Sequence, residues 1–163
     1  MKITSNRFFL FYLILGAFCL NACQSQNFYE KYYDLPNSEW FVDSVLSFDF
    51  EIKEAQKTYN FYYFIRNSIS YPYSNLYVNF YLENSQGEVL DKELQNITLF
   101  NAKTGKPFGA GLGDIFSHEL PPPKLTRYTF PKPGKYTFKL KQYMREDPIK
   151  GMITMGLIIQ EVK

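Results

Sequence analysis

Cysteine is scarce in this sequence, which has 163 residues and only two cysteines, Cys19 and Cys23. Both lie near the N-terminus, at an apolar run that resembles a signal peptide. If cleavage occurs before Cys23, the mature chain keeps one cysteine and cannot form an intramolecular disulfide, which is a common stabiliser of exported domains. A hydrophobic core must then hold the fold.

Histidine is also scarce, because His118 is the single one. A His-based metal site or a Ser-His-Asp triad would depend on it, and its neighbours Ser117 and Glu119 would point apart in an extended chain. We interpret His118 as a surface-loop residue. The sequence has no EF-hand pattern and no mature cysteine that is free to act as a nucleophile. We therefore expect no catalytic residue, no metal site and no cofactor, and rank an enzyme behind two kinds of binding protein.

Net charge is absent from the expected mature chain. The full sequence has 18 Lys and Arg and 16 Asp and Glu, and its first 22 residues hold two of the basic residues and none of the acidic ones. Cleavage leaves sixteen of each sign on 141 residues, which is enough for one domain. Because Lys and Arg do not cluster, nucleic acid is not expected as a partner.

The N-terminus has the layout of a lipoprotein signal peptide. A basic start without acidic residues precedes the apolar run at residues 8–20, which is shorter than the roughly 20 residues of a spanning helix. The run leads into Leu20-Asn21-Ala22-Cys23, which resembles the lipobox of bacterial lipoproteins. We predict a signal peptide over residues 1–22, cleavage between Ala22 and Cys23, and lipid attachment to Cys23. The alternative is an ordinary secreted protein with a stray cysteine.

The residues after Cys23 bear on location and reach. Gln24 occupies the place where an inner-membrane retention signal would have Asp, and no acidic cluster follows that would favour export to the cell surface. We therefore expect an outer-membrane lipoprotein that faces the periplasm. Residues 23–39 lack a clear hydrophobic period and are predicted to be the lipidated N-terminus and a tether. The tether could extend roughly 50 Å, although its aromatic residues leave open that part of it docks on the domain at residues 40–163.

Aromatic residues are abundant and indicate β structure. Phe, Tyr and Trp total 31, of which 26 would remain after cleavage, and Tyr and Phe favour half-buried pleated surfaces. No persuasive helical period occurs after Cys23, so we predict an all-β fold, an antiparallel two-sheet β-sandwich of about seven or eight strands. Alternating or continuous apolar patterns predict strands at residues 47–53, 59–66, 75–83, 134–143 and 151–162, and one or two more within 89–101.

Two loops contain residues that a plain hairpin does not require. Tyr71-Pro72-Tyr73-Ser74-Asn75 is predicted to be a turn, and a proline between aromatic residues favours a cis Tyr71–Pro72 bond. Residues 109–114 include three glycines in five residues but lack the Lys-Ser/Thr of a phosphate-binding loop. This loop either shapes a tight backbone path that lets another element approach, or presents Asp114 as part of a binding loop.

We predict that the two loops lie together at one end of the sandwich and form an interaction surface. Asp114 is expected to pair with Arg66 or Arg145, because an arginine in apolar surroundings needs a partner. The alternative is that these residues only close one end of the core. The predicted surface consists of Arg66, Asn67, Tyr71, Pro72, Tyr73, Asn75, Gly109, Gly111, Gly113, Asp114 and Arg145.

Four short motifs in order carry a resemblance to a known family. They are Arg66-Asn67 with Tyr71-Pro72-Tyr73-x-Asn75-Leu76, Gly109-x-Gly111-x-Gly113-Asp114, Phe130-x-x-Pro133-Gly134-x-Tyr136, and Gln142-x-Met144-Arg145. With the lipobox, they resemble the GldH gliding-motility lipoproteins of the Bacteroidetes, up to about Ile159.

The resemblance implies a cell-envelope lipoprotein that is needed for gliding and is tied to the machinery that drives type IX secretion. We therefore expect a non-enzymatic scaffold or stability component whose partners are other envelope motility or secretion proteins. The alternative is a sandwich that binds carbohydrate or peptidoglycan through exposed tyrosine rings. Trp40, the single tryptophan, lies at the start of the domain and does not favour that alternative.

The lipid anchor can be tested with a Cys23→Ala variant. Acyl chains contribute about 0.8 kcal/mol per buried CH₂, so two or more chains hold a protein firmly on a membrane. We expect the variant to move from the membrane fraction to the soluble fraction when cells are fractionated. A variant that remains with the membrane as the wild type does would refute lipidation at Cys23.

Overall fold

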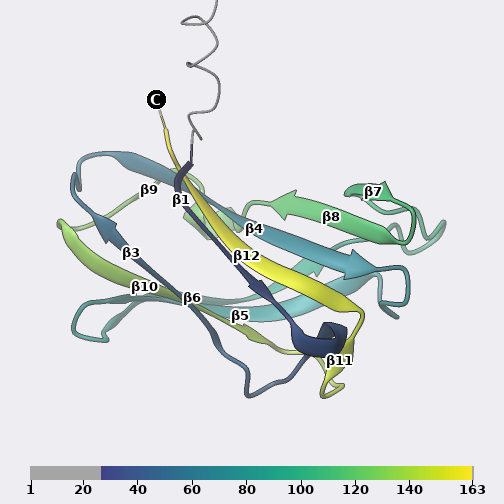
Figure 1. Cartoon of the computed structure of the whole chain (residues 1–163). Coiled ribbons are helices and arrows are strands. Elements are labelled where there is room, and N and C mark those ends of the chain that lie inside the picture. Colours follow the sequence, from purple (N-terminus) through teal and green to yellow (C-terminus); the bar gives the residue numbers. More distant parts are fainter. Residues whose placement is uncertain (1–26, 163) are drawn as a thin grey trace, which may run out of the picture.

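The computed structural model describes residues 27–162, and nearly all of their regular structure is β-strand (Figure 1). The signal peptide, the cleavage site and Cys23 lie outside the described residues. Within residues 27–162, no helix is long and apolar enough to cross a membrane. The strands are β1 Asn27–Asp34, β2 Glu39–Trp40, β3 Leu46–Ile52, β4 Thr58–Ser68, β5 Asn75–Asn84, β6 Val89–Thr98, β7 Ala110–Leu112, β8 Ile115–Leu120, β9 Tyr128–Thr129, β10 Gly134–Gln142, β11 Ile149–Lys150 and β12 Met152–Glu161; two short 3₁₀ helices are η2 Pro36–Ser38 and η3 Pro123–Leu125.

The strands form two main antiparallel sheets. The first has the order β1-β12-β4-β8-β7, with β9 also paired to β4, and the second has the order β3-β10-β5-β6. β2 and β11 form a separate two-stranded pair. The all-β sandwich prediction is confirmed, but residues 27–162 contain twelve strands, several of them very short, where seven or eight were predicted. The run 89–101 contains a single strand, β6. β4 and β12 have partners on both sides, as their apolar faces predicted.

Aromatic side chains fill the space between the two sheets. Residues of β4 alternate between buried and less buried, so that Tyr59, Phe61 and Tyr63 point inward. The Phe61 ring lies 6.0 Å from Phe50 of β3 and 5.9 Å from Phe138 of β10, measured between centroids. Aromatic pairs at such distances add stabilisation beyond the buried area. Much of the aromatic content therefore serves the core.

The prediction that residues 23–39 form a tether is wrong for residues 27–39. Asn27–Asp34 is β1, which pairs along its length with β12. Its inward residues Tyr29 and Tyr33 contact Phe50 and Phe48, with centroids 5.5 and 5.2 Å apart. The period of two was hidden in the sequence because charged residues are mixed with tyrosines in this edge strand. Only residues 23–26 remain for a tether, and they lie outside the described part of the chain.

The register of the strands defines the two ends of the sandwich. Asn27 pairs with Gln160, and Tyr59 pairs with Glu161, so the N-terminus of β1 and the C-terminus of β12 lie at the same end. We call this the proximal end, and Figure 1 shows β1 and the C-terminus side by side there. β1 runs to Asp34 at the opposite end, which we call the distal end, where β4 also ends and β5 begins.

Gly156 tests how closely β1 packs on the sheet. A Cβ at this position of β12 would overlap the Tyr32 ring of β1 and lie 3.1 Å from the Lys31 carbonyl oxygen. We expect Gly156→Ala to lower the free energy of unfolding by about 1–3 kcal/mol, as overpacking does. Urea denaturation of the mature protein in detergent measures this change. Adding Tyr32→Ala to Gly156→Ala should restore part of the loss, and an unchanged midpoint for Gly156→Ala would refute this packing.

Candidate interaction surface at the distal end

The two loops of interest lie together at the distal end. β4 pairs with β8, with Ser68 opposite Ile115, and the Ile69 N–H donates to the Asp114 carbonyl oxygen at 2.7 Å. Residues 109–114, for which the sequence predicted no strand, form β7 and its tight turn into β8. The turn that follows β4 and the β7–β8 hairpin therefore lie side by side, as the sequence predicted.

The predicted ion pair of Asp114 is wrong. Within residues 27–162, no salt bridge involves Asp114, Arg66 or Arg145. The Arg66 guanidinium lies over the Phe64 ring at 5.5 Å, and its Nε is 3.4 Å from the Ser117 hydroxyl. Arg66 and Asp114 are both exposed, so water can solvate their charges and no partner is needed.

The glycines of the β7–β8 hairpin serve close packing. A Cβ at Gly109 would overlap the Ser117 carbonyl oxygen and lie 2.7 Å from Nδ1 of His118, and one at Gly111 would overlap the Phe116 ring. Gly113 has a φ of 63° in the turn before Asp114. Residues 109–114 were predicted either to let another element approach closely or to form a binding loop. The geometry shows the close approach, of β8.

The prediction that His118 lies in a surface loop is wrong. His118 is on β8 with 2% of its surface exposed, and its Nε2 lies 3.1 Å from Oδ1 of the fully buried Asn67. Its Nδ1 has no hydrogen-bond partner among residues 27–162. Burial lowers the pKa of His118 below its ordinary value of 6.5. Alternation along β8 places His118 inward, beneath the β7–β8 hairpin. His118 and Asn67 form a buried polar contact in the core.

The Tyr-Pro-Tyr turn is held by its tyrosines. Tyr71 is buried and its hydroxyl donates to the Asn75 carbonyl oxygen at 2.7 Å, and the rings of Tyr71 and Tyr73 meet edge-on at 5.8 Å. The predicted cis bond at Pro72 is wrong, because the cis peptide bond of the described chain lies at Asp147–Pro148. The tyrosine rings contact each other, and Pro72 itself is exposed.

Three residues of the predicted surface line one groove of about 500 Å³, which we call the tyrosine groove. They are Tyr73, Asn75 and Arg145, and the other lining residues are Tyr77, Leu94, Tyr143 and Met144. Of the remaining predicted residues, Asn67 and Tyr71 are buried, Arg66 and Pro72 are exposed outside this groove, and the three glycines and Asp114 lie at the β7–β8 hairpin. The predicted set therefore does not form one site.

Backbone contacts fix the shape of the tyrosine groove. The Tyr143 N–H donates to the Tyr77 carbonyl oxygen at 2.8 Å, and Sδ of Met144 accepts from the Tyr77 N–H at 3.2 Å. Tyr143 is 57% exposed and Leu94 49% exposed. The sequence analysis missed Tyr77, Leu94 and Tyr143, although large apolar residues at outward strand positions are the signal that could have revealed them.

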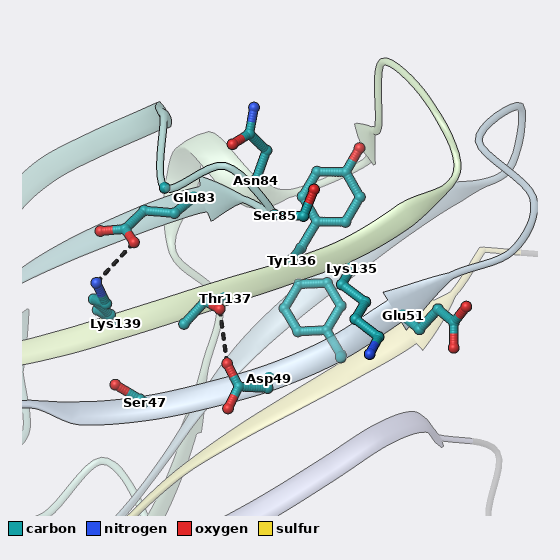
Figure 2. A pocket seen from close by; sticks show the side chains of 12 residues that line it. Ser47, Asp49, Glu51, Glu83, Asn84, Ser85, Lys135, Tyr136, Thr137 and Lys139 are labelled. Carbon is teal, nitrogen blue, oxygen red and sulfur yellow. Dashed lines mark hydrogen bonds and ion pairs between the residues drawn. The ribbon is translucent and has the colours of Figure 1, made fainter.

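A hollow of about 720 Å³ is an open polar surface on the outer face of β3, β5 and β10 (Figure 2). Two polar contacts cross it: Thr137 donates to Asp49 at 2.7 Å, and Lys139 pairs with Glu83 at 2.7 Å. Over the described residues, no cluster of three His, Cys, Asp or Glu side chains could hold a metal ion. The hollow therefore shows the features of a solvated sheet face.

Comparisons with known proteins converge on one family. A model of the GldH lipoprotein family matches residues 27–159. The chain is 28% identical to "Gliding motility lipoprotein GldH homolog" of Christiangramia forsetii, over 96% of this chain and 97% of that protein. It is 26% identical to "Gliding motility lipoprotein GldH" of Flavobacterium johnsoniae, over 91% and 94%. Among solved structures, the match to an arabinose-bound α-L-arabinofuranosidase covers 80% of this chain and 19% of that protein, at 12% identity and a TM-score of 0.37. A likeness this weak bears on neither function nor ligand.

The buried histidine predicts a loss of stability in mild acid. Because the folded-state pKa of His118 is lowered, the unfolded chain binds more protons below about pH 6.5, and the free energy of unfolding must fall as the pH falls through that range. Thermal unfolding between pH 7.5 and 5.5 measures this slope. Since the chain has one histidine, His118→Gln should flatten the slope, and an equal slope in the variant would refute the assignment.

Proposed function

The chain belongs to the GldH lipoprotein family, and we propose that it is a non-enzymatic scaffold lipoprotein of the outer membrane. In this proposal it faces the periplasm and holds a protein partner within the gliding machinery and the type IX secretion machinery associated with it. The observation that carries the proposal is the gathering of exposed tyrosine, leucine and arginine side chains around the half-buried Met144 in the tyrosine groove at the distal end.

The position of the anchor supports this arrangement. With lipid on Cys23, three residues lie between the anchor and Asn27, and the four Cα–Cα steps reach at most about 15 Å. The proximal end then lies close to the membrane, because Asn27 is the first residue of β1. β1 has eight residues, which at about 3.3 Å each carry the distal end roughly 26 Å further away. The tyrosine groove would thus be directed towards a partner in the periplasm.

The chemistry of the tyrosine groove suits a protein partner. Aromatic residues, methionine and arginine are enriched at protein interfaces, and tyrosine and arginine frequently supply most of the binding free energy. Tyr73, Tyr77 and Tyr143 share the groove with Met144 and Arg145. A non-enzymatic role agrees with the position of His118, which is buried beneath the hairpin and does not line this groove.

A carbohydrate ligand is the second candidate. The observation that favours it is three tyrosines beside Asn75 and Arg145 in one groove, because aromatic faces and polar groups together can hold sugars. The tyrosines are interleaved with Leu94 and Met144, however, which gives a mixed apolar surface and favours protein. Trp40 is fully buried and cannot contribute.

Arg145→Glu and Tyr143→Ala test the proposal. Either change should reduce recovery of an envelope partner by cross-linking in intact cells by at least about tenfold, and should impair colony spreading where the strain glides. Both residues lie on the surface, so the unfolding midpoint should stay close to that of the wild type. Lys135→Glu, the same charge change on β10 near the proximal end, is the matched control and should have no effect.

Two results would contradict the protein-binding proposal. One is unchanged partner recovery in both variants. The other is retention of the wild-type protein on purified peptidoglycan that Tyr143→Ala abolishes, which would favour the carbohydrate candidate.

A further inference from the structure

The outer edge of β6 has backbone groups that no strand of the described chain pairs. β6 is the last strand of its sheet and pairs with β5 alone. Because the Tyr77 carbonyl oxygen accepts from Tyr143 on the β10 side, its β5–β6 partner Asn96 must direct its own backbone groups away from β5. The same alternation turns the N–H and C=O groups of Leu94 and Thr98 outward.

These outward groups lack partners. Among residues 27–162, and beyond the β5–β6 ladder, no hydrogen bond involves the backbone N–H or C=O of Leu94, Asn96 or Thr98. Lys92 differs, because its N–H donates to Oδ1 of Asp91 at 2.8 Å. The open edge therefore extends from Leu94 to Thr98.

A groove of about 380 Å³ lies beside this open edge, and we call it the edge groove. The residues that line it opposite β6 are Leu120, Pro121 and Pro123, together with Tyr63 of β4. Proline has no N–H, so this wall is largely apolar. The Tyr63 hydroxyl donates to Oε1 of Gln95 at 2.7 Å, and burial raises the pKa of Tyr63 well above 10.0, which keeps that donor protonated.

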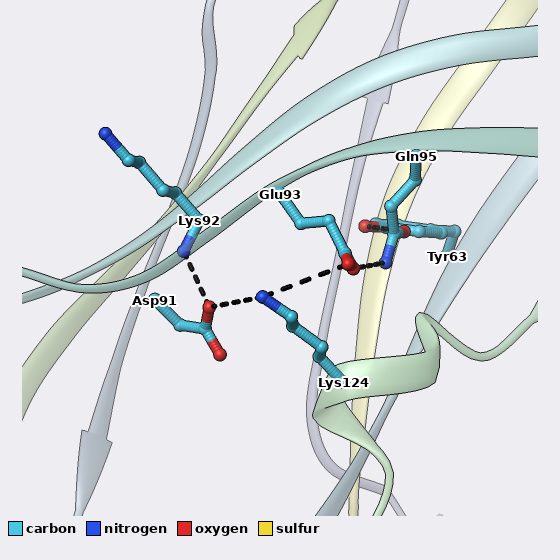
Figure 3. A network of polar contacts seen from close by, with 6 residues as sticks. All are labelled: Tyr63, Asp91, Lys92, Glu93, Gln95 and Lys124. Atoms are coloured by element: carbon cyan, nitrogen blue, oxygen red, sulfur yellow. Dashed lines mark hydrogen bonds and ion pairs between the residues drawn. The ribbon is translucent and has the colours of Figure 1, made fainter.

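A polar network limits the edge groove at one end (Figure 3). Nζ of Lys124 lies 3.7 Å from Oδ1 of Asp91 and 3.9 Å from Oε1 of Glu93, and Nε2 of Gln95 donates to Glu93 at 2.9 Å. The other end of the edge groove, beside Thr98, faces the distal end of the sandwich. Leu94 lines both the edge groove and the tyrosine groove, so the two hollows adjoin.

Other edges of the two sheets are less suited to pairing. On β3, the Ser47 carbonyl oxygen already accepts from the Tyr33 hydroxyl at 2.5 Å and from Lys31 at 3.1 Å. β7 has only three residues, and β1 has Glu30 and Lys31 in its centre. Charges on an edge oppose strand addition, and short edges limit it. Residues 94–98, LQNIT, are uncharged.

From this geometry we infer that the open edge at residues 94–98 binds an extended segment of the protein partner, which adds as a further strand beside β6. The inference rests on the proposed function and names how the partner is held. Main-chain hydrogen bonds supply the general affinity in this mode, and pockets for alternate side chains supply the specificity. The segment is about five residues long, uncharged, and places apolar side chains against Leu120 and Pro121 in the edge groove.

A proline substitution separates backbone pairing from side-chain contact. Asn96→Pro removes the outward N–H at the centre of the open edge, and proline is tolerated on an edge strand where the N–H faces solvent. Asn96→Ala removes the side chain and its bond with Asn75 but keeps the N–H. Lys92→Pro places the same ring on β6 outside the open edge. The three variants therefore form a matched set.

Cross-linking in intact cells reads out the pairing. The mature chain has no cysteine besides Cys23, so Leu94→Cys or Thr98→Cys provides a single site for benzophenone maleimide. We expect both sites to cross-link to one segment of one envelope protein, at positions about four residues apart, as in paired strands. Asn96→Pro should lower the yield at least about tenfold, whereas Asn96→Ala and Lys92→Pro should stay within about twofold of the wild type.

Several outcomes overturn the inference. They are an unchanged yield with Asn96→Pro, an equal loss with Asn96→Ala, cross-links from the two sites to unrelated segments, and cross-links to a second copy of this chain or to glycan. If Arg145→Glu lowers partner recovery and Asn96→Pro does not, strand addition is wrong while the proposed function stands. If neither variant lowers recovery, the proposed function fails as well.

Discussion

The contact of aromatic rings across the two sheets is the interaction on which the structure depends. Phe138 of β10 stacks on Phe80 of β5 at 5.4 Å and meets Phe61 and Tyr63 of β4 at 5.9 and 6.2 Å. Because residues 27–162 contain no cysteine and so no disulfide, this burial of apolar surface must offset the conformational entropy of folding. These rings join β4, β5 and β10, whose ends carry the Tyr-Pro-Tyr turn and the residues of the tyrosine groove.

The sequence was sufficient to predict the layers but not the edges. Interior strands such as β4 and β12 have strong apolar patterns, because both of their faces are covered. β1 has one covered face and one polar face, and its charged residues Glu30 and Lys31 concealed that pattern. β7 and the whole of β8 were missed. Residues 109–113 resemble a loop in composition, although Gly109 and Gly111 allow close contact with β8.

The sequence predicted which loops lie together at the candidate site but not which residues line the groove there. Strand order along the chain placed the Tyr-Pro-Tyr turn and the glycine hairpin at one end, and that is where they lie. The ion pair of Asp114 was predicted wrongly because the sequence did not show that Arg66 and Asp114 are both exposed. Exposed charges remain solvated and need no partner. His118 was misplaced because the strand that buries it was not recognised. Residues of the tyrosine groove come from three strands or their ends, and only the sheet order brings Tyr77, Leu94 and Tyr143 together.

The direction of β1 has a mechanical consequence for a lipid-anchored protein. Its N-terminal residue Asn27 lies at the proximal end, and its hydrogen bonds to β12 are perpendicular to the strand axis. A load applied at the distal end and resisted by a lipid on Cys23 would pull β1 along its own axis. All of the β1–β12 hydrogen bonds would then share the force in shear, instead of breaking one after another as they would if the strand were peeled from its end. In the proposed arrangement, with lipid on Cys23 and a protein partner at the distal end, β1 is thus oriented to withstand tension between the anchor and that partner.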